Sequence, residues 1–135
     1  MVFLKYSTSA ALGLLYFSLI GGFSAPKIVK VLDSTSYLTQ DIARTWQRLN
    51  ETFEMVIDCL ESEDSLKVGE KGWKAVIKVR LLHSKVRLKI LSGNWSASEY
   101  GLPINQEDMM ATLLAFSINV LDSIKKIGAP LSREV

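Results

Sequence analysis

The segment from Trp73 to Leu91 constrains the fold of this chain more than any other part of its sequence. It contains no glycine or proline, and its apolar residues outnumber its polar ones. At 100° per residue, four lysines fall within a stripe of about 60°, and most other positions are apolar. A helix with this pattern has one solvent face and is covered by neighbours elsewhere. We therefore predict a helix over 73–91, ended by Ser92 and Gly93, that neighbouring helices largely bury. The lysines are Lys74, Lys78, Lys85 and Lys89.

The rest of the chain also predicts helices. Apolar residues over 41–60 recur at spacings of four and three, which is the helical period: Ile42, Trp46, Leu49, Phe53, Val56 and Leu60. Pro26 suits the first position of a short helix over 27–32. A last helix is bounded by Asn105, a capping residue, and by Gly128. No segment alternates as a strand does, so the predicted class is all-α, a multi-helix orthogonal bundle.

The amino-acid composition excludes several structural and functional classes for this chain. The chain has 135 residues, of which 48% are apolar, so it predicts a single ordered domain over 1–135 and excludes intrinsic disorder. A net charge of +2 argues against nucleic-acid binding through bulk charge. One cysteine, Cys59, and one histidine, His83, exclude a disulfide framework and a metal site made of several cysteines or histidines.

The segment over 10–23 carries no charge and is the most apolar stretch of the chain. Three interpretations remain open: a core helix packed closely at its glycines, a membrane-associated segment, or a secretory signal. The run is short for a membrane span, which needs about 20 apolar residues. We expect an endomembrane or cytoplasmic protein rather than a secreted one.

Three nitrogen-rich side chains interrupt the apolar part of the 73–91 helix. Arg80, His83 and Arg87 are spaced three and four residues apart, on a line roughly opposite the lysines. This predicts that all three point into the protein, where cations need partners. One interpretation is that the arginines pair with acids of a neighbouring helix around a core histidine. The other is a site for a buried anionic ligand, for which a haem on His83, with its propionates at Arg80 or Arg87, is suited.

A second polar pair lies on the 41–60 helix. Arg48, Thr52, Met55 and Cys59 share one face, and methionine and cysteine are usually buried. Arg48 and Thr52 therefore either look inward or occupy an exposed half-turn in which Arg48 pairs with an acid. Cys59 is interpreted as a packing residue, because the chain has no second cysteine for it.

Several motifs in the order found here resemble the catalytic domain shared by the rubber oxygenases, or latex-clearing proteins, and the fungal ER-bound oxygenase mpaB. The segment over 79–87 resembles the helix that carries the haem histidine in that family. The segment over 100–108 resembles the loop and helix start that follow, and Arg48 with Thr52 resembles an Arg-x-x-x-Thr motif near the haem. The resemblance covers about residues 10–135.

The resemblance implies an all-α domain around a buried haem b. It implies O2-dependent cleavage of a carbon–carbon double bond in a lipophilic, isoprenoid-like substrate. By position, His83 would be the proximal iron ligand, with Arg80 and Arg87 as its cofactor-binding neighbours. Arg48 and Thr52 would be the catalytic pair beside the haem.

One position departs from the pattern of the rubber-cleaving members. They can carry a distal lysine three residues after the motif arginine, where this chain has Glu51, so rubber is not the expected substrate. The chain is also expected to be an incomplete member of the family. Two alternative functions stay open: a non-catalytic, membrane-associated helical protein that keeps the scaffold, and a carrier of an acidic ligand at Arg80 and Arg87.

Overall fold

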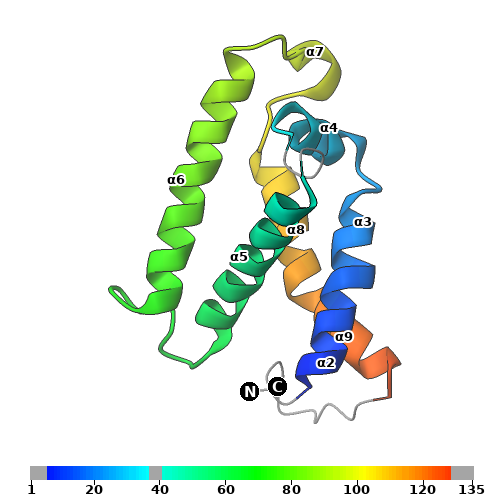
Figure 1. The fold of residues 1–135 in the computed structure, drawn as a ribbon, viewed down its shortest axis with the longest axis vertical. Helices are drawn as coiled ribbons and strands as arrows, with labels where there is room; N and C mark the ends of the chain where they lie inside the picture. The colour runs from blue at the N-terminus through cyan, green and yellow to red at the C-terminus, as the bar shows by residue number, and fades with distance from the viewer. Residues whose placement is uncertain (1–5, 37–40, 129–135) are drawn as a thin grey trace. The chain divides into compact units, whose positions relative to one another are not determined.

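The computed structural model describes residues 6–36 and 41–128 and confirms the predicted all-α class, since these ranges contain helices and no strand (Figure 1). The chain divides into two compact units. The terminal unit comprises the described residues 6–26 and 106–128, and the central unit comprises residues 27–105. Each unit is described by itself.

The N-terminal apolar segment forms one continuous helical run in the terminal unit. Its parts are α2 (Ser7–Gly13), a π-helical stretch η1 (Leu14–Leu19) and α3 (Ile20–Gly22). The run packs against α8 (Gln106–Phe116) and α9 (Ile118–Lys126), and Figure 1 shows α2 beside α9.

The contact between this run and α9 is close. A Cβ added at the buried Gly13 would lie 2.9 Å from the Cβ of Ser123, so only glycine allows this approach. The hydroxyl of the buried Ser18 donates a hydrogen bond to the carbonyl of Ala115 on α8. One face of the 10–23 segment is thus a packed face, as the core-helix interpretation expects.

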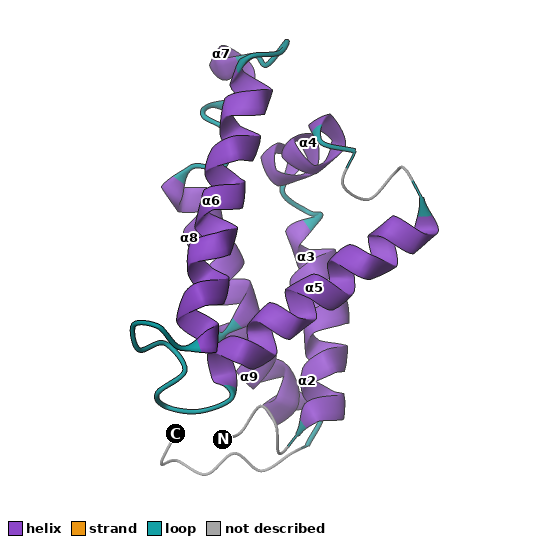
Figure 2. Cartoon of the chain, turned by 60° about the vertical axis from the view of Figure 1, so that its left-hand side comes forward, coloured by secondary structure: helices purple, strands orange, loops and turns teal. Residues whose placement is uncertain are grey.

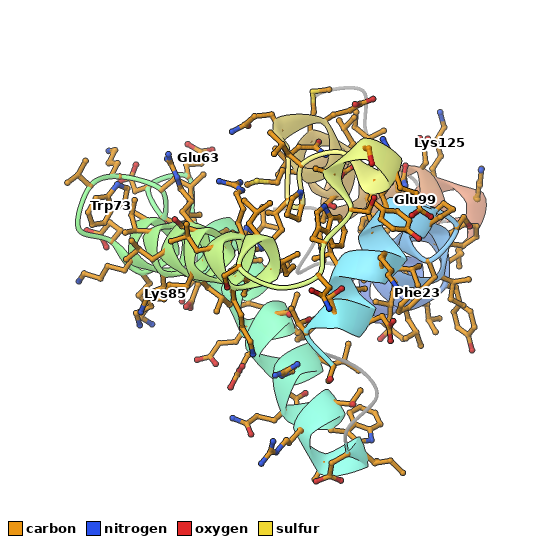
Figure 3. The ribbon with its side chains drawn as sticks, turned by 90° about the horizontal axis from the view of Figure 1, so that it is seen from above. Phe23, Glu63, Trp73, Lys85, Glu99 and Lys125 are labelled. Atoms are coloured by element: carbon orange, nitrogen blue, oxygen red, sulfur yellow. The ribbon has the colours of Figure 1, made fainter. Side chains whose placement is uncertain are left out.

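The opposite face of the same run is apolar and exposed. Tyr16 is 58% exposed, Ile20 53% and Phe23 39% (Phe23 is labelled in Figure 3). Within the described ranges, no helix taken alone has the length and apolar composition to cross a membrane. Residues Ser7–Gly22 and Pro26–Ser34 meet that criterion only when the two segments, which are not one straight helix, are taken together.

The predicted single helix at the C-terminal end is wrong, because Ser117 interrupts it between α8 and α9. The backbone of Ser117 has φ −114° and ψ −81°, outside the helical region. Its hydroxyl donates to the carbonyl of Leu113, at 2.8 Å. Thr112 makes the same bond to the carbonyl of Asp108 inside α8 without a break, so the hydroxyl bond accompanies the break at Ser117 and does not by itself account for it. The apolar periodicity continues across Ser117 and does not reveal the break.

The central unit contains α4 (Pro26–Ser34) from its second residue on, followed by α5 (Ile42–Leu60), α6 (Lys71–Leu91) and α7 (Ala97–Tyr100). The side chain of Asp41 caps α5 by accepting from the backbone N–H of Ala43, at 3.1 Å.

Helices α5 and α6 are packed at one end and diverge toward the other. A Cβ added at Gly72 would lie 2.7 Å from the carbonyl oxygen of Asp58 and 2.9 Å from the Cα of Cys59. The backbone N–H of Trp73 donates to the carbonyl of Ser65, which ties the connecting loop to the start of α6. From this end the two helices separate, as Figures 1 and 2 show from two directions.

Because of this divergence, the prediction that neighbours largely bury α6 is wrong for the chain as described. Leu81 is 60% exposed, Leu82 51% and Leu88 66%. The lysine stripe is exposed as predicted, and Lys85 projects away from the ribbon in Figure 3. On α5, Val56 is buried whereas Ile42 is 78% exposed. The apolar pattern identified both helices but not how much of each a neighbour covers.

We predict that Gly72→Ala lowers the free energy of unfolding by about 1–3 kcal/mol, because the new methyl group would meet backbone atoms that cannot rotate away. Urea denaturation followed by circular dichroism measures this change. The matched control is Gly93→Ala in the same unit, where a Cβ would lie 3.5 Å from the carbonyl oxygen of Ile90, an ordinary contact. Equal effects of the two substitutions would contradict a close helix crossing at Gly72.

Candidate functional site

The three nitrogen-rich side chains of α6 differ in their exposure. His83 and Arg87 are half-buried, whereas Arg80 is exposed and forms no hydrogen bond or ion pair with the described residues. The prediction that all three point into the protein is therefore wrong for Arg80. It lies nearly two turns before Arg87, whose side chain bonds the 101–104 segment.

His83 has a buried nitrogen without a partner. Its Nδ1 atom is buried and makes no hydrogen bond among the described residues, and the other ring nitrogen, Nε2, is not buried in this way. Burial, and next the positive charge of Arg87, lower the pKa of His83 below its ordinary value of 6.5. The imidazole is thus kept neutral at pH 7. Neutral imidazole is the form that binds a metal ion.

Arg87 is engaged by backbone rather than by the acidic partner that one interpretation supposed. Its Nε atom donates to the carbonyl of Pro103, at 3.2 Å, and a terminal guanidinium nitrogen donates to the carbonyl of Ile104. The arginine thereby connects the turn of α6 after His83 to a segment 16 and 17 residues further along the chain.

Sequence reasoning did not anticipate how the 101–104 segment is held. Four successive carbonyls, those of Gly101, Leu102, Pro103 and Ile104, accept hydrogen bonds from side chains. The donors are Trp95 Nε1 to Gly101 at 2.8 Å, Asn105 Nδ2 to Leu102 at 3.0 Å, and Arg87 to the last two. Two residues here have positive φ, Gly101 at 70° and Ile104 at 53°. The one signal in the sequence was the turn-forming composition around Gly101 and Pro103.

Helix α5 carries the second set of candidate residues. Arg48, Thr52, Met55 and Cys59 are all half-buried, which agrees with their sharing one face. The hydroxyl of Thr52 donates to the carbonyl of Arg48, at 2.9 Å, within the helix. Glu51 is exposed and accepts from Gln47 Nε2, at 2.8 Å. Within this set Cys59 lies against Gly72, where α5 and α6 are close. Arg48 and Thr52 lie further along α5, in the direction in which the two helices separate (Figure 2).

Cys59 lies at the close end of the two helices. Its Sγ atom is 3.8 Å from the carbonyl oxygen of Gly72. Burial, and to a smaller extent the charge of Asp58, raise the pKa of its thiol. A cysteine that is kept protonated is a poor nucleophile, so the structure is consistent with the packing role predicted for it.

Comparison with known proteins identifies the family. The family model described as "ER-bound oxygenase mpaB/B'/Rubber oxygenase, catalytic domain" matches residues 5–135. The chain belongs to this family. No curated protein and no solved structure matches the chain. Membership in the mpaB/rubber oxygenase family supports a general role as an oxygenase.

In this oxygenase domain we predict that His83 makes stability depend on pH. As the pH falls, His83 is protonated at a higher pH in the unfolded chain, where its pKa is near 6.5, than in the folded protein, where its pKa is lowered. The free energy of unfolding should therefore fall as the pH drops below about 6.5, by at most about 1.4 kcal/mol per pH unit for this one group. Urea denaturation of the wild type and of His83→Gln between pH 5 and 7.5 measures the difference. The same slope in both proteins would contradict the lowered pKa.

Proposed function

We propose that this domain is a haem b-dependent oxygenase, with His83 as the protein ligand of the iron. The observation that carries the proposal is the burial and hydrogen bonding of His83, the one histidine of the chain. Its Nδ1 atom is buried and has no hydrogen-bond partner among the described residues, and the next turn of its helix is tied to a distant segment through Arg87. Burial also lowers the pKa of His83, which favours the neutral imidazole.

The donor set of the chain suits a haem better than a metal ion bound by protein alone. Within the described ranges, no group of three or more histidine, cysteine, aspartate or glutamate side chains is placed to hold a metal. A protein-only zinc site needs three or four such ligands. A haem brings its own four nitrogen ligands and needs one axial residue from the protein, commonly a histidine.

Arg80 is the residue that we expect to meet a haem propionate. It is three residues before His83, so the two side chains are neighbours on the surface of α6. Its guanidinium is exposed and makes no ion pair with the described residues. A planar guanidinium also matches the geometry of a carboxylate.

Thr52 and Arg48 are the proposed catalytic pair beside the haem. Thr52 Oγ1 already donates its only proton to the carbonyl of Arg48. Toward a bound molecule this oxygen therefore acts as an acceptor, unless it releases the bond within the helix. The positive charge of Arg48 would lie one turn away and stabilise negative charge that develops on oxygen.

The proposed substrate is a lipophilic, isoprenoid-like alkene. When bound, haem b would supply the iron at which O2 reacts with a carbon–carbon double bond, and cleavage yields two carbonyl groups. Val79 and Val86 are half-buried and lie within about 60° of His83 around α6. They provide apolar surface beside the proposed iron ligand, against which a hydrocarbon chain would gain free energy by leaving water. A glutamate at position 51, rather than lysine, favours a farnesyl-type chain over rubber.

We predict that His83→Ala weakens haem binding by more than about 100-fold. Loss of a residue that only hydrogen-bonds a metal ligand already lowers metal affinity by about 10–100-fold, and His83 is the proposed ligand itself. Titration of the apoprotein with haem, followed by the Soret absorption, measures the affinity. Ser84→Ala, at the exposed neighbouring position, is the matched control and should bind as the wild type does. Unchanged affinity in His83→Ala, with helicity retained by circular dichroism, would contradict the assignment.

The reaction itself is tested with the reduced, haem-loaded protein under O2. We expect carbonyl products from a farnesyl-type substrate, detected by mass spectrometry, and at least a tenfold lower yield with Thr52→Val, which keeps the shape but removes the hydroxyl oxygen. A haem-loaded wild type that forms no carbonyl products from isoprenoid alkenes would favour the non-catalytic alternative.

A further inference from the structure

We infer that Arg87 is a positioning residue, which clamps the 101–104 segment onto α6 and thereby fixes the orientation of His83. The inference rests on the proposed function in one respect: it takes His83 to be the iron ligand. Arg87 then has a structural role, whereas Arg80 is the residue proposed to bind a haem propionate, although both arginines lie on the same side of the helix.

The geometry of the helix links Arg87 to His83. Side chains of an α-helix lean toward its N-terminus, so a residue covers the turn before its own. Arg87 therefore leans over the turn that carries His83, and its positive charge acts on the imidazole. When the guanidinium is fixed at its far end by two carbonyls, the stem of the side chain is fixed as well. It then limits the rotamers open to His83.

The segment that Arg87 holds would not keep its conformation unaided. Ile104 has φ 53°, a region that β-branched residues rarely adopt. Such backbone conformations persist where surrounding contacts determine them, and they concentrate at functional sites. Pro103 is buried, and both the Pro103 and Ile104 carbonyls are bonded to Arg87. Trp95 and Asn105 bond the two preceding carbonyls, and Arg87 is the side chain that bonds the carbonyl of Ile104 itself.

The chemistry of this contact requires arginine and not merely a positive charge. The guanidinium presents N–H groups in a rigid fork, so two of them reach successive carbonyls at once. A lysine ammonium is a single point of charge on a flexible stem and cannot keep both bonds in the same geometry. Arg80 makes no comparable contact with the described residues and remains open to an anion.

Hydrogen exchange of the haem-free protein tests the clamp directly. We expect amide exchange in peptides covering 101–106 to be at least about tenfold faster in Arg87→Lys and Arg87→Ala, the factor that follows from losing one charge-assisted hydrogen bond. Arg80→Ala is the matched control and should exchange as the wild type does in this segment. Unchanged exchange in both Arg87 variants would overturn the clamp, whatever the protein does with haem.

A second variant tests the strain. Glycine adopts positive φ without cost, so the loss of stability caused by Arg87→Lys should be smaller in an Ile104→Gly background than in the wild type. Equal losses in the two backgrounds would contradict the idea that Arg87 holds Ile104 in its conformation.

The link to His83 is tested by haem titration of the same variants. Arg87→Lys should bind haem more weakly than the wild type and give a broadened Soret band, because the imidazole then samples several orientations. Faster exchange at 101–106 with unchanged haem affinity and band shape would overturn the link. If the wild type binds no haem, the proposed function fails, while the exchange experiment still decides whether the clamp exists.

Discussion

The close contact at Gly72 is the constraint on which the central unit depends. There the backbone of α6 touches the backbone of α5 around Asp58 and Cys59, at distances that leave no room for a side chain. Because the helices diverge from this point, the contact decides which turns of α6 are covered by α5 and which are not. His83 lies three turns beyond it, and Arg87, one turn further on, bonds a different element, the 101–104 segment. The proposed iron ligand therefore lies between the contact of α6 with α5 and its contact with the 101–104 segment.

Much of the secondary structure could be predicted from the sequence, because the signals for it are local. The period of the apolar residues located α5, and the run from Trp73 to Ser92 located α6 to within two residues at each end. The break at Ser117 could not be predicted in this way. It lies at one serine whose φ and ψ leave the helical region, which the apolar pattern does not record.

The candidate site was predictable only in part, for a related reason. A helical wheel placed Arg80, His83 and Arg87 on one line, and two of the three are half-buried there. The wheel cannot state what covers each turn, so it treated Arg80 and Arg87 as equivalent. The difference between them comes from two backbone carbonyls 16 and 17 residues away from Arg87, a contact of the tertiary structure. The family membership supports an oxygenase, and the state of His83 motivates the proposal of how a haem would be held.

The most direct test of the account is resonance Raman spectroscopy of the reduced, haem-loaded and untagged protein. His83 is the chain's one histidine, so an iron–histidine stretching band can arise from no other residue. The account predicts this band in the wild type, its loss in His83→Gly, and its return when free imidazole is added to that variant. A haem-bound wild type without the band, or a band that persists in His83→Gly, would contradict the assignment of His83 as the iron ligand.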